Sequence, residues 1–191
     1  MYDFKYRPSG HGEVSKRVLE LLNNAKIPAM ADTDHGLDHG AWSPLSIVFP
    51  KADVPLIQVS LQSQLDPKFH LKVGQALAAL QDEDVLVIGS GSATHNLRDL
   101  SSLMGNPNPS AQNYAEEFDG HLRELLVKHE GEERNTELAK IYQHHLCRRA
   151  HPTTEHLAPV FVAAGAGFAH KATSLHSRMM YGALSMACYS L

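Results

Sequence analysis

Apolar residues recur along the chain at spacings typical of amphipathic helices. In residues 13–23 they fall on one helical face, which predicts a helix over this stretch. The same periodicity predicts helices over residues 70–80, 113–128 and 137–146. A further helix is expected to begin at Thr153 or Thr154, both good capping residues, and to run to about residue 164.

Other apolar stretches have the pattern of strands. Residues 54–61 are rich in branched side chains, and residues 84–89 form a continuous apolar run typical of a strand buried on both faces. A last strand is expected within residues 181–189. Because a strand, a helix and a strand follow one another, the order implies a parallel crossover connection. We therefore predict an α/β fold, a single domain over residues 1–191 with a mostly parallel central sheet flanked by helices.

Two polar stretches separate these elements. Residues 106–109 alternate asparagine and proline, which predicts a loop. Residues 128–134 are almost all charged, which predicts a solvated surface turn. Neither stretch resembles a low-complexity linker, so the sequence indicates no boundary between domains.

Composition narrows the class of protein. With 191 residues, 43% hydrophobic, 20% charged and a net charge of -4, the chain is typical of a globular protein and lacks the basic surface of a nucleic-acid binder. No apolar run approaches the roughly 18 residues of a membrane span. Cys147 and Cys188 lack metal or redox spacing and fit a reducing compartment. We expect a cytoplasmic protein that binds neither nucleic acid nor membrane, and an oligomer is not excluded.

A glycine-serine turn, residues 89–94, follows the second predicted strand and leads to His95 and Asn96. Ligands bind at the carboxyl ends of strands in open α/β sheets, so these two side chains are candidate site residues. The turn is not a dinucleotide fingerprint, because Thr94 stands where that motif requires glycine or alanine. A purely structural role for His95 in the turn is the alternative.

Two more histidines lie at predicted element ends. His39 follows Asp38 and precedes a glycine, although His35 stands in the same context and is equally eligible. His156 lies near the start of a predicted helix, whose positive end favours the neutral imidazole that metals bind. An ordinary polar turn and a solvated helix end are the competing interpretations. If His39, His95 and His156 converge, they would form one metal-centred site.

In their order along the chain these segments resemble the class III extradiol ring-cleaving dioxygenases, the LigB-like family, and within it the branch that contains DOPA 4,5-dioxygenases. The resemblance covers nearly the whole chain and is carried by residues 36–45, 53–61, 87–98 and 151–159. It implies that His156 is a metal ligand and that His95 is the catalytic acid and base. It also implies that His39 and Asn96 bind the substrate, and that His39 lies near the metal and is a second catalytic residue. The implied cofactor is non-haem Fe(II), with zinc as the alternative metal, and the implied substrates are a DOPA-like catechol and O2.

Relative to that family, the chain is expected to lack an N-terminal segment that supplies two further metal-ligating histidines. His11 stands in a sequence that superficially echoes one of the missing motifs. A non-catalytic relative that keeps the fold without a full metal site is therefore the alternative to an enzyme. A zinc-dependent hydrolase fits less well, because the chain has no His-Glu-x-x-His motif.

Overall fold

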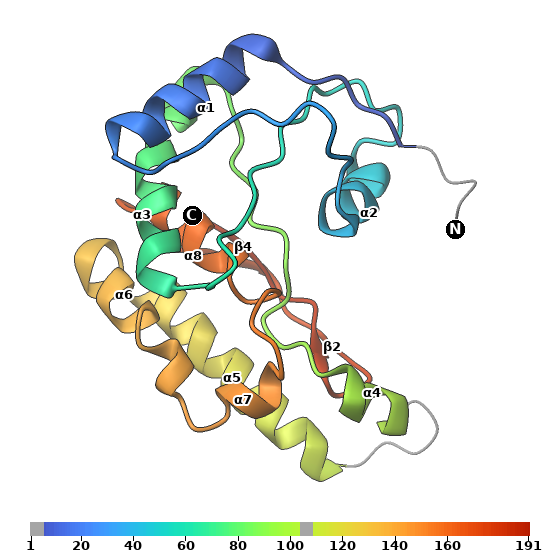
Figure 1. Ribbon diagram of the computed structural model, residues 1–191. Helices are drawn as coiled ribbons and strands as arrows, with labels where there is room; N and C mark the ends of the chain where they lie inside the picture. The colour runs from blue at the N-terminus through green and yellow to red at the C-terminus, as the bar shows by residue number, and fades with distance from the viewer. Residues whose placement is uncertain (1–5, 104–108) are drawn as a thin grey trace. The chain divides into compact units, whose positions relative to one another are not determined.

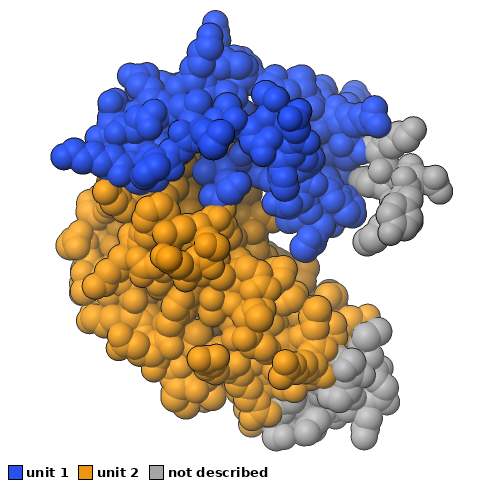
Figure 2. Space-filling model, viewed as in Figure 1, with its two compact units in different colours: residues 1–60 blue, residues 61–191 orange. Residues whose placement is uncertain are grey.

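The structure, a computed structural model, describes residues 6–103 and 109–191. The chain divides into two compact units, residues 1–60 and residues 61–191, which are coloured separately in Figure 2. The expectation of a single domain stays a prediction. The predicted loop at residues 106–109 lies outside the described residues except for Pro109, which begins a helix.

Unit 1, residues 1–60, contains the helices α1 (Gly12–Asn24) and α2 (His39–Val48) (Figure 1). The predicted first helix is confirmed as α1. Its N-cap is His11, whose Nδ1 accepts a hydrogen bond from the backbone N–H of Val14 at 3.3 Å. Helix α2 begins at His39, and Asp38 takes the N-cap position.

Unit 2, residues 61–191, holds the remaining helices of the described chain. The predicted helix at residues 70–80 is confirmed as α3 and the 3₁₀ turn η1, and the helix at 113–128 as part of α5. Asp66 caps α3 by accepting from the N–H of Phe69 at 3.0 Å, and Pro67 suits its first turn. In order the elements are α3 (Pro67–Leu77), η1 (Ala78–Glu83), α4 (Leu97–Leu103), α5 (Pro109–Lys128), α6 (Gly131–Leu138), η2 (Ile141–Gln143), α7 (Cys147–Ala150) and α8 (Pro159–Ala166).

The prediction of a solvated turn over residues 128–134 is wrong for residues 131–134, which are helical. Helix α6 begins at Gly131, which adopts a positive φ of 58° that glycine tolerates best. Arg134 is fully buried and donates hydrogen bonds to the carbonyls of Ala164, Gly167 and His170. These oxygens lie at and beyond the end of α8, where a cation offsets the negative pole of the helix. A charged residue thus belongs to the interior because helix carbonyls compensate it.

The helix expected from Thr153 or Thr154 starts later. Residues 151–158 form turns, and α8 begins only at Pro159. The carbonyl of Thr154 accepts from the N–H groups of Leu157 and Ala158, both at 3.0 Å, which closes a turn before the helix. His156 therefore lies in a turn rather than in the first turn of a helix. The helix expected over residues 137–146 is likewise interrupted, by η2 between α6 and α7.

The described strands form two separate antiparallel pairs. Strand β1 (Thr173–His176) pairs with β4 (Cys188–Ser190), and β2 (Met179–Met180) pairs with β3 (Leu184–Ser185). The expected C-terminal strand is thus present as two short ones, but a mostly parallel central sheet is not confirmed. Residues 54–61 and 84–89 carry no strand assignment, and Leu86 is 76% exposed. An apolar run favours an extended chain, but only a neighbouring backbone turns it into a strand.

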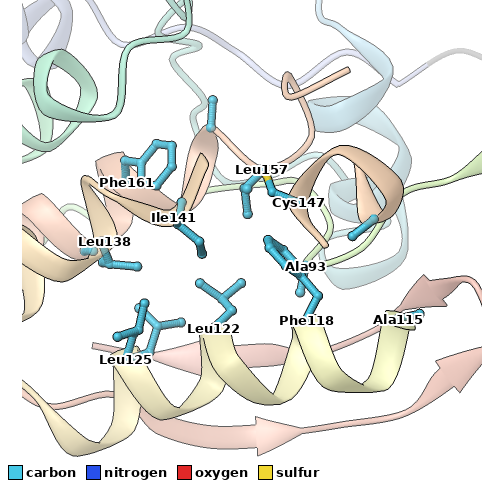
Figure 3. Close-up of a cluster of buried hydrophobic side chains, with 14 of the residues drawn as sticks. Ala93, Ala115, Phe118, Leu122, Leu125, Leu138, Ile141, Cys147, Leu157 and Phe161 are labelled. Carbon is cyan, nitrogen blue, oxygen red and sulfur yellow. The ribbon is translucent and has the colours of Figure 1, made fainter. Parts of the chain in front are cut away.

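The core of unit 2 gathers on one face of α5. Figure 3 shows Phe118, Leu122 and Leu125 of this helix pointing toward side chains of the α6–α8 region, among them Leu138, Ile141 and Phe161. Helices α3 and α8 cross closely, because a methyl group at Gly74 or at Gly165 would collide with the backbone of the other helix. Within residues 6–103 and 109–191, no helix combines the length and the apolar character needed to span a bilayer.

Candidate active site

Two segments distant in sequence are joined by hydrogen bonds in unit 2. One is the glycine-serine turn with the residues that follow it, 89–96, and the other is residues 149–156. The backbone N–H of Ser92 donates to the carbonyl of His156, and that of His95 donates to the carbonyl of Ala150, both at 2.8 Å. The side-chain amide of Asn96 donates to the carbonyl of Arg149, also at 2.8 Å. The backbone of both candidate histidines is therefore held by the opposite segment.

The turn is also held on its other side by the residues of β3. Thr94 is fully buried, and its hydroxyl donates to the carbonyl of Ala183 at 3.0 Å and accepts from the N–H of Ser185 at 2.8 Å. His95 itself bridges to Leu184 in antiparallel fashion. A short stretch before His95 is thus fixed between two neighbours, which is how a rigid scaffold presents a functional side chain.

Gly91 makes the approach of the two segments possible. A methyl group at this position would collide with the carbonyl oxygen of His156. The glycine that the sequence placed in a turn is thus required for close packing against the second segment.

The imidazoles of His95 and His156 stack on each other. Their ring centroids are 3.6 Å apart and the ring planes differ by 29°. Both side chains are half-buried, and Nε2 of His156 lies 3.8 Å from a carboxylate oxygen of Glu155. Burial raises the pKa of Glu155, but the hydrogen bond from Thr153 and the nearby His156 and His95 together hold this pKa below its ordinary value. A carboxylate thus stands beside the stacked rings.

A third histidine, His151, lies close to this pair and was not predicted as a site residue. It is 1% exposed, and its Nε2 donates to the carbonyl of Ala93 at 2.8 Å. Its Nδ1 is buried without a hydrogen-bond partner in the described structure. Burial, and then the proximity of His95 and His156, lower the pKa of His151 to about 4, so the ring is neutral at pH 7. No sequence motif marks this role, which depends on burial beside residues such as Ala150. We call His95, His151 and His156 the inner cluster.

Comparison with known proteins decides the family. A model described as the catalytic LigB subunit of aromatic ring-opening dioxygenase matches residues 1–190. The chain belongs to the LigB family. It is 40% identical to a 4,5-DOPA dioxygenase extradiol of Beta vulgaris and 32% identical to one of Escherichia coli K12, covering 99% and 87% of this chain. It spans 69% of the first relative's length and 59% of the second's.

A solved structure supports the same assignment. The crystal structure of an uncharacterized protein from Escherichia coli K12 matches with a TM-score of 0.80 and 30% sequence identity. The match covers 99% of this chain and 76% of that one. The LigB-like part of the fold prediction is therefore confirmed.

The other two predicted site residues of this LigB-family chain stand in different surroundings. Asn96 is 5% exposed, and its carbonyl oxygen accepts from the N–H groups of Arg98 and Asp99, so its side chain caps α4. His39 begins α2 in unit 1, and the neighbouring Asp38 exchanges hydrogen bonds with Gln58. Contact of Asn96 or His39 with a substrate stays a prediction.

LigB-family enzymes use a non-haem metal, and His156 offers a nitrogen donor of a suitable kind. A catalytic mononuclear centre takes three protein ligands. In the described part of the chain, His156 belongs to no group of three His, Cys, Asp or Glu side chains whose ligand atoms converge. The described surroundings of His156 therefore do not make up a complete metal site.

Proposed function

We propose that this LigB-family chain acts in extradiol cleavage of a catechol ring, on a DOPA-like substrate with O2. The observation that carries the proposal is the stack of His95 on His156, fixed by hydrogen bonds between residues 89–96 and 149–156. The relatives named 4,5-DOPA dioxygenase extradiol support the reaction type and the substrate class.

The cofactor we propose is Fe(II), with zinc as the alternative, and His156 as one of its ligands. Such a metal would supply a Lewis acid that anchors the catechol and activates O2. Because His156 belongs to no converging group of three ligands among the described residues, the proposal assigns only this one ligand to the metal. A carboxylate oxygen of Glu155 lies 3.8 Å from Nε2 of His156, so we propose that Glu155 orients this ring.

The proposed task of His95 is proton transfer. Its ring lies against His156, so a catechol held near His156 has an imidazole within reach of its hydroxyl group. One ring nitrogen of His95 takes the hydroxyl proton as the ring is attacked and returns a proton to the opened product. We propose that His39 lines the substrate pocket and that Asn96, through its cap on α4, keeps the segment after His95 in place.

The test is oxygen uptake with L-DOPA by protein reconstituted anaerobically with Fe(II), together with metal analysis. We expect uptake and a coloured ring-opened product, with His156→Ala losing both metal and activity. His95→Gln should keep the metal and lose a factor of about 10² to 10⁴ in kcat. The control is His129→Ala, because His129 pairs with Glu133 at the far end of α5. The proposal is wrong if the wild-type protein shows no oxygen uptake and binds no iron.

The alternative is a relative that keeps the fold without catalysis, and the incomplete ligand set around His156 favours it. This alternative predicts a cooperatively folded chain that binds no stoichiometric iron. It also predicts that His95→Gln and His156→Ala change nothing that can be measured except stability. Metal analysis therefore separates the two functions before any kinetic measurement.

A further inference from the structure

A second group of histidines lies on the outside of unit 2, away from the residues of the inner cluster. Glu117 and His121 are one turn apart on α5, and His144 and His145 follow η2. We call these four residues the outer cluster. Ligand atoms of Glu117, His144 and His145 all lie within 4.8 Å of one another. This is the one such three-residue group among the described residues.

The outer cluster is held together by ring contacts and one ion pair. His121 stacks on His144 with centroids 4.5 Å apart, and His144 lies 4.7 Å from His145. Nε2 of His145 is 3.5 Å from a carboxylate oxygen of Glu117. The side chains of His145 and Glu117 are 70% and 60% exposed, so small rotations suffice to bring the ligand atoms closer. A bound ion needs only such rotations, because tetrahedral ligands at about 2.0 Å from zinc lie roughly 3.3 Å apart.

The chemistry of these side chains suits a borderline transition metal. Two imidazoles and one carboxylate are the ligand set of open zinc sites, in which water takes the fourth position. The carboxylate of Glu117 supplies the negative charge that a divalent cation requires.

We infer that Glu117, His144 and His145 form a peripheral site for Zn²⁺ or a similar divalent transition metal, distinct from the proposed active site. The ion joins α5 to the segment between η2 and α7. Since these elements are far apart in sequence, the ion acts as a cross-link that stabilises unit 2. The site shares no residue with the inner cluster and does not depend on the proposed function.

One existing hydrogen bond must give way. The N–H of Leu146 donates to Nδ1 of His144 at 3.3 Å. Ligation through Nδ1 takes that acceptor away, and ligation through Nε2 places a proton on Nδ1. The amide resonance of Leu146 therefore reports occupancy of the site directly, without any measurement of activity.

The experiment is titration of the chelator-treated full chain with Zn²⁺, followed by calorimetry, by metal analysis after dialysis and by NMR of the Leu146 amide. It is carried out in the His156→Ala background as well, which removes the proposed catalytic ligand. We expect one equivalent of Zn²⁺ to remain in that background and the Leu146 resonance to shift. We also expect the unfolding temperature to rise by roughly 5–10 °C at a Zn²⁺ concentration a hundred times Kd.

Two exposed substitutions test the ligands with little risk to folding. Glu117→Gln keeps the shape of the side chain, and His145→Ala removes an exposed ring, so each should weaken binding at least tenfold. His129→Ala removes a histidine at the end of the same helix and should leave the affinity unchanged. The inference is overturned if both ligand variants bind Zn²⁺ as the wild type does, or if the zinc lost on His156→Ala is the whole of what the chain binds.

Discussion

The inner and outer clusters use the same side chain in opposite environments. In the inner cluster His151 is almost completely buried and its one described hydrogen bond goes to a backbone carbonyl. In the outer cluster His145 is mostly exposed and faces a carboxylate. Burial keeps the His151 ring neutral and holds it in place. The exposed His145 ring, by contrast, can rotate to bind an ion. Histidine count alone, 13 in this chain, does not distinguish the two cases.

A single aromatic side chain contacts both clusters. The ring of Phe118 on α5 lies edge-on to His144 at 5.5 Å and to His151 at 5.6 Å, measured between centroids. Phe118 is fully buried in the core of unit 2. The core around Phe118 thus separates the buried inner cluster from the exposed outer cluster. Substitutions in this core should change the packing of the histidines in both clusters.

The largest effect is expected from Phe118→Ala. Removing a fully buried ring costs about 3–5 kcal/mol of unfolding free energy and leaves a cavity beside both His144 and His151. Urea unfolding measures this loss. Phe118→Leu is the control, since it keeps most of the apolar volume and should cost less than about 1.5 kcal/mol. A loss below about 1 kcal/mol for the alanine variant would show that Phe118 does not separate the clusters.

The second prediction concerns pH and isolates the inner cluster. The pKa of His151 is about 4 in the folded chain and 6.5 ordinarily, so between these values only the unfolded chain takes up the proton. The stabilisation is complete above pH 6.5 and is lost as the pH falls to about 4, a change of roughly 3 kcal/mol. Urea unfolding at several pH values measures this slope.

The matched variant is His151→Gln, whose amide can still donate to the carbonyl of Ala93 but does not titrate. Groups that face His151, namely His95, His156 and Glu155, are present in both proteins, so the difference between the two slopes belongs to His151. Equal slopes would contradict the assignment of a neutral buried ring.

The sequence predicted the longer amphipathic helices of the fold but not the pairing of its strands or its buried arginine. Helical periodicity located α1, α3 and α5, because an amphipathic helix forms its hydrogen bonds within its own segment. Residues 84–89 have an equally strong apolar pattern but form no strand, since strand hydrogen bonds need a partner that local sequence does not specify. Arg134 was misassigned because the carbonyls that compensate its burial come from the end of α8.

For the site, the sequence singled out His39, His95 and His156 as residues of one site. The structure brings His95 and His156 into contact, and a place for His39 in the same site stays a prediction. What joins them is backbone pairing between distant segments, which no local pattern records. His151 was overlooked because its role depends on burial rather than on its motif. The outer cluster was not predicted, because Glu117 is distant from His144 and His145 in the sequence and only the structure places it beside them.

The third prediction is smaller and tests the close approach within the inner cluster. Gly91→Ala should cost about 1–3 kcal/mol, because the added methyl group collides with the carbonyl of His156 and pushes the two segments apart. Gly120→Ala is a matched control within α5, where a methyl group meets nothing within 4 Å, and it should stabilise the chain by about 0.5–1 kcal/mol. Equal effects of the two substitutions in urea unfolding would mean that Gly91 is not needed for contact.

The last prediction concerns the reactivity of the two cysteine thiols and involves no change in stability. The thiols serve as probes of the region between the clusters. Cys147 begins α7, which connects the outer cluster to His151, and it is 2% exposed, whereas Cys188 is exposed. Burial raises the pKa of Cys147 to about 11, so almost no thiolate forms at pH 8. A disulfide reagent should therefore label Cys188 at once and Cys147 only after unfolding, and Cys188→Ser should leave the native chain unreactive. If Cys147 of the native chain reacts as fast as Cys188, α7 opens readily and the inner cluster is not sealed from solvent on that side, because labelling of a buried thiol follows local opening.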